Sequence, residues 1–288
     1  MPKKLKQTIF CQILHSLEKV DKNIICVFST LEECKQMFTF LKTNKRKVLY
    51  TKNQKFKLSE RGNFLICTPE RFDATLAFYP FHNWLSEFDS VIFYDSDLLL
   101  NSERSNILEA DIIRVSRFNP FVRKILIFCD VENVESLAVW TKSCLIDYVG
   151  KGKEEYKSKF LEEENVLTQS LIEIVSSGSR TLNELRSFFE RSFSYFQGNS
   201  IPSLRHILSK LIDHNLILKR ENYYPTSLGK LCVGLRLPIV LQIKIISELR
   251  RGVSPQTLKK TIVRHCKYSY KWICDAIDSI SRLIGCKV

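Results

Sequence analysis

Short, continuous apolar runs alternate with segments of helical periodicity along the first half of the chain. The runs have the length of strands and lie at residues 23–29, 63–67, 91–94 and 124–128. Strands that are apolar at successive positions are buried on both faces, as in a parallel sheet. The segments between them place apolar residues every three or four positions, which predicts helices at 8–18, 31–42, 70–76, 107–116 and 134–141. This alternation predicts an α/β domain with helices on both faces of its sheet.

The second half of the chain has a mainly helical pattern. Helices are expected at 161–176, 181–196 and 202–214, followed by short strands at 216–219 and 223–224. Gly178 is placed to end the first of these helices. Thr181 and Glu184 have the spacing of a capping box at the start of the second. Three helices followed by a hairpin is the order of a winged helix.

The composition indicates a globular protein without a metal site or an export signal. Apolar residues make up 44% of the chain, but no run approaches the length of a membrane span, so no membrane partner is expected. The polar amino terminus does not resemble a signal peptide, and secretion is not expected. The ten cysteines include no C-x-x-C pair and the five histidines are scattered, so no metal ligands are predicted. Cysteines inside apolar runs, such as Cys26, Cys67 and Cys129, are expected to be buried and reduced.

The charge of the chain is concentrated in its second half. The formal net charge is +13. Residues 1–150 contribute 21 Lys and Arg against 18 Asp and Glu, and residues 151–288 contribute 23 against 13. A basic half of this kind favours a polyanionic partner, most often nucleic acid. The alternative is a generic charge that keeps the protein soluble.

An acidic cluster follows the predicted strand at 91–94 and is the clearest chemical motif of the chain. That strand ends in Tyr94 and is followed by Asp95 and Asp97, and ligands bind at this end of an open α/β sheet. The motif resembles motif II of superfamily 2 DExH helicases, most closely the polymerase-theta-like DNA helicases. In that family the strand ends in Asp-Glu-x-His. Here Tyr94 replaces the magnesium-binding Asp, Asp95 the catalytic Glu and Asp97 the His.

Two further nucleotide motifs of that family are altered. In the phosphate-binding loop the resemblance aligns Gln7 with the essential Lys and Thr8 with the Thr that follows it, and lysines replace the glycines. Glycines are needed in such a loop because its backbone approaches the phosphates closely. Phe128, Cys129 and Asp130 stand where the family has Ser-Ala-Thr. The resemblance thus implies a RecA-like scaffold without catalytic residues and without a cofactor.

One further motif points to nucleic acid. Thr68, Pro69 and Glu70 match the T-P-E of motif Ib, which in the family contacts the nucleic-acid backbone. The same tripeptide is a common helix start, so a structural cap is the alternative. The segment 42–57 carries seven Lys or Arg and no acid, and it is either a solvated loop or a phosphate-contacting loop.

The resemblance extends into the second half, where Y-P-T-x-L-G-x-L at 224–231 matches the family's winged-helix signature. The predicted fold class is α/β plus mainly α, with a RecA-like parallel-sheet domain, a winged-helix domain and a short carboxyl-terminal helical stub. The predicted boundaries are 1–148 for the RecA-like domain, 149–156 for a linker in place of the second RecA-like domain, 157–236 for the winged helix and 237–288 for the helical segment.

Basic residues of the predicted winged helix are the candidate nucleic-acid contacts. Arg205 and Lys210 lie on its third helix, which often enters the major groove, and Lys219 and Arg220 lie at the wing. In these helicases the module mainly packs between domains, so an adaptor role is the alternative.

The sequence as a whole predicts a helicase-derived pseudoenzyme without ATPase activity. It would bind single-stranded or branched DNA, or serve as an adaptor, in repair, recombination or meiotic genome maintenance. Its location would be nuclear in a eukaryote and cytoplasmic otherwise. A protein partner is expected to cover the face left by the missing second RecA-like domain. The alternatives are a protein-interaction module without nucleic-acid affinity and an unusual active ATPase. The substitutions at Gln7, Tyr94 and Phe128 argue against a merely truncated helicase.

Overall fold

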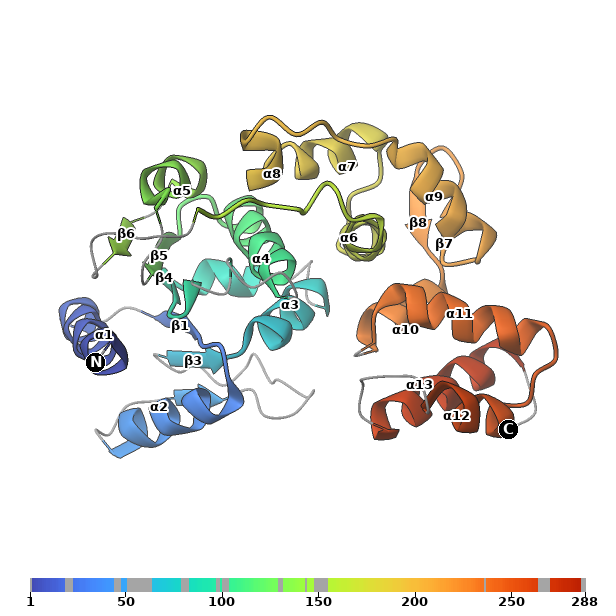
Figure 1. Ribbon diagram of the computed structural model, residues 1–288, viewed down its shortest axis with the longest axis horizontal. Helices are drawn as coiled ribbons and strands as arrows, with labels where there is room; N and C mark the ends of the chain where they lie inside the picture. Colours follow the sequence, from blue (N-terminus) through green and yellow to red (C-terminus); the bar gives the residue numbers. More distant parts are fainter. Residues whose placement is uncertain are drawn as a thin grey trace. The chain divides into compact units, whose positions relative to one another are not determined.

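The structure, a computed structural model, is described here for residues 2–18, 23–43, 48–50, 64–78, 83–96, 99, 104–128, 132–142, 144–147, 155–235, 237–263 and 270–285. The chain forms two compact units (Figure 1). The first contains residues 1–159 and 191–198, and the second contains 160–190 and 199–288. These limits differ from the predicted boundaries, because residues 157–159 and 191–198 were assigned to the winged-helix domain.

A parallel sheet forms the centre of the first unit. Within the described residues it has six strands in the order β2-β3-β1-β4-β5-β6, and every neighbouring pair is parallel. The α/β class with a parallel sheet is thereby confirmed. The strands are β1 (Ile24–Val27), β2 (Val48–Tyr50), β3 (Phe64–Cys67), β4 (Ser90–Phe93), β5 (Arg123–Phe128) and β6 (Cys144–Asp147).

Helices cover both faces of this sheet, as the alternating pattern predicted. One face packs against α1 and α2, and the other packs against α3, α4, α5 and the 3-10 helix η1. The helices of the first unit are α1 (Pro2–Glu18), α2 (Leu31–Thr43), α3 (Pro69–Phe78), η1 (Asn83–Glu87), α4 (Ser105–Phe118), α5 (Val134–Thr141) and α8 (Phe193–Phe196).

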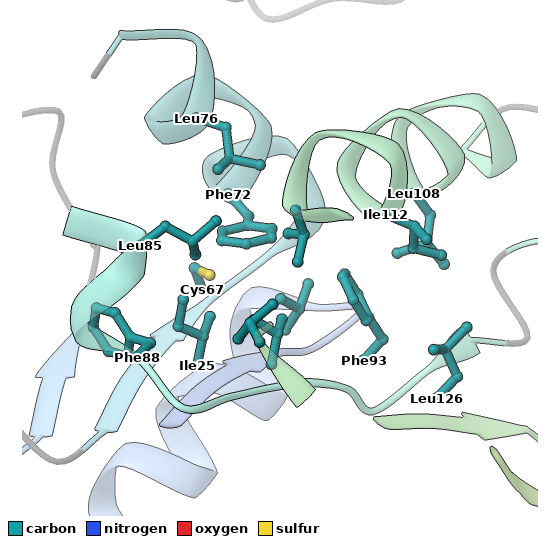
Figure 2. Close-up of a cluster of buried hydrophobic side chains, with 14 of the residues drawn as sticks. Ile25, Cys67, Phe72, Leu76, Leu85, Phe88, Phe93, Leu108, Ile112 and Leu126 are labelled. Atoms are coloured by element: carbon teal, nitrogen blue, oxygen red, sulfur yellow. The ribbon is translucent and has the colours of Figure 1, made fainter. Parts of the chain in front are cut away.

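Successive side chains of each central strand enter opposite layers of the core. In β1, Ile25 faces the layer of α3 and α4, whereas Cys26 faces the layer of α1 and α2. Figure 2 shows the first of these layers, in which Phe72 of α3 and Ile112 of α4 point toward the strands. This two-sided burial explains why the central strands are apolar at every position. Cys26 and Cys67 are both buried, as expected, and burial raises the pKa of their thiols.

The two outer strands, β2 and β6, were not predicted. β2 lies inside the basic segment 42–57, which had been read only as a loop, and residues 51–57 lie outside the described part of the chain. β6 occupies residues next to the polar stretch that had suggested a linker. Each is a short strand at an end of the sheet order, and such strands lack the long apolar run that marks a central strand.

The second unit is mainly helical, with one antiparallel hairpin. Helix α6 packs against α9, α10 and α11, and α13 packs against α10, α11 and α12. No described helix is both long and apolar enough to span a bilayer. The elements are α6 (Glu164–Ser176), α7 (Leu182–Phe189), α9 (Leu204–Asp213), β7 (Ile217–Lys219), β8 (Tyr223–Pro225), α10 (Ser227–Gly234), α11 (Ile239–Arg250), α12 (Pro255–Val263) and α13 (Tyr270–Ile284).

The local signals at the start of this unit act as predicted. Gly178 has a φ of 110°, and the N–H of Ser179 donates to the carbonyl of Ile174 at 3.2 Å, which ends α6. Thr181 accepts a hydrogen bond from the N–H of Glu184, and the Glu184 carboxylate accepts one from the N–H of Thr181. The predicted capping box is therefore confirmed.

The single helix predicted at 181–196 is wrong, because the chain breaks after Phe189. Ser192 caps a new short helix, α8, by accepting a hydrogen bond from the N–H of Tyr195 at 3.1 Å. The aromatic residues that suggested one stripe thus belong to two different units. Phe188 and Phe189 are buried in the second unit, whereas Phe193 is buried in the first.

A buried carboxylate, that of Glu109 on α4, holds α8 within the first unit. Its Oε1 accepts hydrogen bonds from the N–H groups of Phe193 at 2.8 Å and Ser194 at 3.4 Å. Its Oε2 accepts from the hydroxyls of Tyr156 and Ser158, each at 2.6 Å. Burial raises the pKa of this carboxyl, and the donors oppose that shift. A fully buried carboxylate is tolerated because each of its oxygens has hydrogen-bond donors.

Aromatic packing surrounds the same attachment. The ring of Phe193 stacks on that of Tyr156 with centroids 5.3 Å apart and lies 5.1 Å from the ring of Trp140. The indole Nε1 of Trp140 donates to the carbonyl of Arg191 at 2.7 Å. Asn133 and Gln197 each hydrogen-bond the backbone of Tyr156. Three segments distant in the sequence are therefore fixed to one another at Glu109.

Replacing Glu109 by Gln should destabilise the first unit. The new amide NH₂ would face buried donors, so we expect a loss of about 2–4 kcal/mol in the free energy of unfolding. Urea unfolding followed by tryptophan fluorescence measures it, because Trp84 and Trp140 both lie in this unit. Glu135→Gln, on the exposed side of α5, is the matched control and should change stability by less than about 0.5 kcal/mol. An unchanged midpoint for Glu109→Gln would contradict the role given to this carboxylate.

Candidate functional site

The carboxyl edge of the sheet is the place where this topology would bind a ligand. The chain leaves β1 toward β2 on one side of the sheet order and leaves β4 toward β5 on the other. β1 and β4 are neighbours, so their carboxyl ends flank the topological switch point. Open α/β sheets bind ligands in the crevice outside such a point.

Asp95 lies at this switch point and hydrogen-bonds across it. It follows β4, and its Oδ2 accepts a hydrogen bond from the N–H of Ser29, which follows β1, at 3.0 Å. The N–H of Tyr94 donates to the carbonyl of Val27 at 2.9 Å and continues the contact between the two strands. The carboxylate that the resemblance aligned with the catalytic Glu thus binds the protein's own backbone.

Arg104, at the amino end of α4, ties the same edge together. Its Nε and Nη2 lie 2.6 Å from Oε1 of Glu70, and its Nη1 donates to the carbonyl of Ser29 at 2.8 Å. The Arg104 side chain is 25% exposed and that of Glu70 47%, so this ion pair lies at the surface. It links the ends of β1 and β3 to the start of α4.

The first turn of α2 is closed by its own carboxylate. Oε2 of Glu33 accepts hydrogen bonds from the hydroxyls of Ser29 at 2.7 Å and Thr30 at 2.9 Å. The N–H of Glu33 donates in turn to the hydroxyl of Thr30 at 3.2 Å. The Thr30 hydroxyl therefore caps α2, and the Glu33 carboxylate holds the hydroxyls of Ser29 and Thr30.

The resemblance aligned Tyr94 with the metal ligand of motif II, and the rings around Tyr94 are aromatic. The side chain is 6% exposed, and its ring centroid lies 5.0 Å from that of Phe10 and 4.9 Å from that of Phe28. Phe10 comes from α1 and Phe28 follows β1, so the cluster joins three elements. Burial raises the pKa of the Tyr94 hydroxyl, which keeps the group neutral. A neutral phenol packed among aromatic rings is a poor ligand for Mg²⁺ compared with a carboxylate.

The segment aligned with the phosphate-binding loop is helical. Gln7 and Thr8 both lie within α1, and the lysines that replace the loop glycines lie in the same helix. Backbone N–H groups inside a helix are used by the helix itself and cannot converge on a phosphate. Within the described ranges, no group of three or more His, Cys, Asp or Glu is placed to hold a metal ion. Phe128 ends β5, whereas Asp97, Cys129 and Asp130 lie outside the described residues.

The motif at Thr68, Pro69 and Glu70 forms a helix start. The carbonyl of Thr68 accepts hydrogen bonds from the N–H groups of Arg71 and Phe72 at 3.0 and 2.8 Å. Pro69 is the first residue of α3 and is buried. Glu70 pairs with Arg104, as described above. These contacts give the three residues a structural role at the edge of the sheet, and phosphate contact by them stays a prediction.

The predicted nucleic-acid-binding residues of the second unit differ in their contacts with neighbouring groups and in their exposure to solvent. Lys210 forms an ion pair with Glu164 of α6 and lowers the pKa of that carboxyl. The Nζ of Lys219 lies 4.3 Å from the centroid of the Tyr223 ring and donates to the carbonyl of Glu221 at 3.2 Å. Arg205 and Arg220 are exposed. The structure thus leaves these two arginines as the more available cations of the predicted set.

The sequence matches no protein-family model. No curated protein matches it either. The likeness to DExH helicases therefore stays a prediction that rests on the motifs of this chain and on the geometry of its sheet.

Sequence reasoning missed several residues that organise these sites. Ser29 and Arg104 carry the contacts of the sheet edge, and neither has a sequence signal beyond its place next to a strand or helix end. Arg180 lies over the ring of Tyr224, with its guanidinium carbon 5.1 Å from the centroid. The two residues are 44 positions apart, and no short-range pattern pairs them.

Replacing Tyr94 by Asp should destabilise the protein rather than restore a metal site. The new carboxylate would lie in an aromatic cluster, and we expect a loss of about 3–5 kcal/mol in the free energy of unfolding. Tyr94→Phe keeps the ring and is the matched control, with an expected loss of about 1 kcal/mol or less. Thermal unfolding of both variants with and without Mg²⁺ makes the measurement. Recovery of Tyr94→Asp by Mg²⁺ would show that the position still functions as a metal site.

Proposed function

We propose that this protein is a helicase-derived pseudoenzyme that lacks ATPase activity and binds nucleic acid. The observation that carries the proposal is the burial of Tyr94 among Phe10 and Phe28 at the position of the metal-binding carboxylate. The helical backbone at Gln7 and Thr8 supports it, because the phosphate loop needs an open, glycine-rich turn.

The remaining acidic groups of the edge support the same proposal. Asp95 accepts from the backbone of Ser29, and Glu70 pairs with Arg104. A catalytic carboxylate must be able to reach a substrate or its water, whereas these two are bound to the chain itself. The parallel sheet and its switch point are compatible with a RecA-like domain that has kept its packing and changed its chemistry.

The second unit supports a winged-helix identity. Helices α6, α7 and α9 precede the β7–β8 hairpin in the expected order. The N–H of Tyr223 donates to the carbonyl of Arg180 at 2.9 Å, so the segment between α6 and α7 pairs with the hairpin. Gly229 of α10 lies against the carbonyl of Leu216, where a Cβ would approach to 2.0 Å. This contact gives the glycine of the Y-P-T-x-L-G-x-L signature a packing role.

Charge supports nucleic acid as the partner of this unit. Residues 199–288 contain 16 Lys or Arg and five Asp or Glu, a formal net charge of +11. The exposed cations among their described residues include Arg205, Arg220 and Lys244. Phosphate contacts by such groups supply most of the affinity of non-specific nucleic-acid binding. Single-stranded or branched DNA in nuclear genome maintenance is the proposed setting.

A protein-interaction module is the second candidate, and exposed apolar side chains of the first unit favour it. Phe121 is 95% exposed and Val139 66%. Phe121 lies in a turn held by Asn119, whose Oδ1 accepts from the N–H of Phe121 and whose side-chain amide donates to the carbonyl of Leu85. An exposed aromatic ring on a turn whose backbone is hydrogen-bonded is a typical anchor of protein interfaces.

Fluorescence anisotropy with labelled single-stranded DNA, duplex DNA and single-stranded RNA over a salt series tests the first candidate. We expect salt-dependent binding, with a slope of roughly 0.7 per phosphate neutralised on a single strand. Arg205→Gln with Arg220→Gln should lower that slope by about 0.7 for each residue on a single strand. The control Lys35→Gln, an exposed lysine of the first unit paired with Glu32, should leave it unchanged.

Two results would count against the proposal. A Kd weaker than about 10⁻⁴ M for all three probes would favour the protein-interaction module. ATP hydrolysis stimulated by DNA, and abolished by Asp95→Ala, would show that the protein is an active ATPase.

A further inference from the structure

The outer face of the β7–β8 hairpin exposes an apolar and an aromatic side chain next to each other. Leu218 and Tyr224 are register partners, and they are 42% and 38% exposed. The neighbouring residues Ile217 and Tyr223 are buried on the opposite face. The exposure of Leu218 and Tyr224 thus follows from strand alternation, which presents both of them on one side of the hairpin.

Arg180 lies over the ring of Tyr224 and is held there by the backbone. Its guanidinium carbon is 5.1 Å from the ring centroid, and its Nη1 donates to the carbonyl of Val175 at 2.6 Å. Its own N–H donates to Glu184 at 2.6 Å, and its carbonyl accepts from Tyr223. These bonds fix the main chain and the guanidinium of Arg180 before any partner arrives, so little further entropy is lost on binding.

A planar cation next to an exposed aromatic ring suits a nucleobase. Unstacked bases stack on tyrosine rings and on guanidinium planes. The charge of Arg180 also attracts the phosphates that flank such a base. Bases inside a duplex are already stacked on their neighbours and are not free for this contact, so the chemistry favours a single strand.

A second cation lies within reach on the same hairpin. Arg220 is exposed at the tip, two residues beyond Leu218, which corresponds to roughly 7 Å along the strand. Its N–H donates to the carbonyl of Asn222 at 3.0 Å, which closes the tip. A strand whose base lies on Tyr224 therefore brings a neighbouring phosphate close to Arg220. The excess of positive charge in residues 199–288 complements such a strand.

We propose that the outer face of this hairpin binds single-stranded nucleic acid by stacking one base against the Arg180–Tyr224 pair. The inference rests on the proposed nucleic-acid binding, narrows the partner to a single strand and adds the residues that contact it. Tyr224 and Arg180 contact the base, and Arg220 contacts the adjacent phosphate.

The test compares two labelled oligonucleotides with the full-length protein by fluorescence anisotropy. One is a thymidine oligonucleotide of about 12 nucleotides, within the usual site size of such modules, and the other has the same length but abasic sugars. Both present the same phosphates, so a difference in Kd reports stacking. The wild-type protein should bind the thymidine strand roughly 5- to 100-fold more tightly.

Variants of the hairpin separate stacking from charge. Tyr224→Ala should bind both oligonucleotides alike, whereas Tyr224→Phe keeps the ring and should keep the preference. Arg220→Gln should weaken the binding of both oligonucleotides by the same factor and lower the salt slope by about 0.7. Tyr195→Ala, which removes a tyrosine of similar exposure from the first unit, is the matched control and should behave as wild type.

The outcomes distinguish this proposal from the function on which it rests. If the wild-type protein binds neither oligonucleotide, both fail. If it binds them equally, or if Tyr224→Ala keeps the preference for bases, only the stacking proposal is overturned. A merely structural role for Tyr224 would weaken both oligonucleotides together and lower the melting temperature of Tyr224→Ala, and that result also overturns the proposal.

Discussion

The first unit depends on a buried carboxylate, that of Glu109, which joins three segments of the chain. Moving a carboxylate out of water costs several kcal/mol unless its oxygens are matched by donors. Here the donors come from the segment around Tyr156 and Ser158 and from the start of α8. Because each segment needs the carboxylate and the carboxylate needs both segments, residues 191–198 are bound into the first unit although the chain on either side of them belongs to the second.

The carboxyl edge of the sheet follows a related rule, because the charged groups described there have partners within the chain. Asp95 accepts from Ser29, and Arg104 pairs with Glu70 and with the carbonyl of Ser29. Where the helicase motif would place a metal carboxylate, Tyr94 fills an aromatic cluster. Contacts of this kind stabilise the fold, whereas an enzyme would leave such groups open for its substrate.

The second unit has a large excess of positive charge, and its cations differ in whether a neighbouring acid neutralises them. Some of its cations are neutralised by neighbours, as Lys210 is by Glu164, while Arg205 and Arg220 are exposed. The hairpin adds an exposed aromatic ring that is backed by Arg180. Cations and an aromatic ring together are the usual means of binding a single strand, and here Tyr224 and Arg220 lie on the hairpin while Arg180 comes from the segment before α7.

The sequence by itself determined the order and type of the central elements. Apolar runs long enough to be buried on both sides located β1, β3, β4 and β5, and local caps such as Thr181 located helix starts. The edge strands β2 and β6 and the break before α8 escaped prediction, because each depends on neighbours that are distant in the sequence. Only the tertiary structure decided that Asp95 faces Ser29, that Glu109 binds α8 and that Arg180 covers Tyr224. Those contacts join residues tens of positions apart. Hydrophobic periodicity gives no information about contacts at such separations, because the partner is selected by packing and by the pairing of buried polar groups.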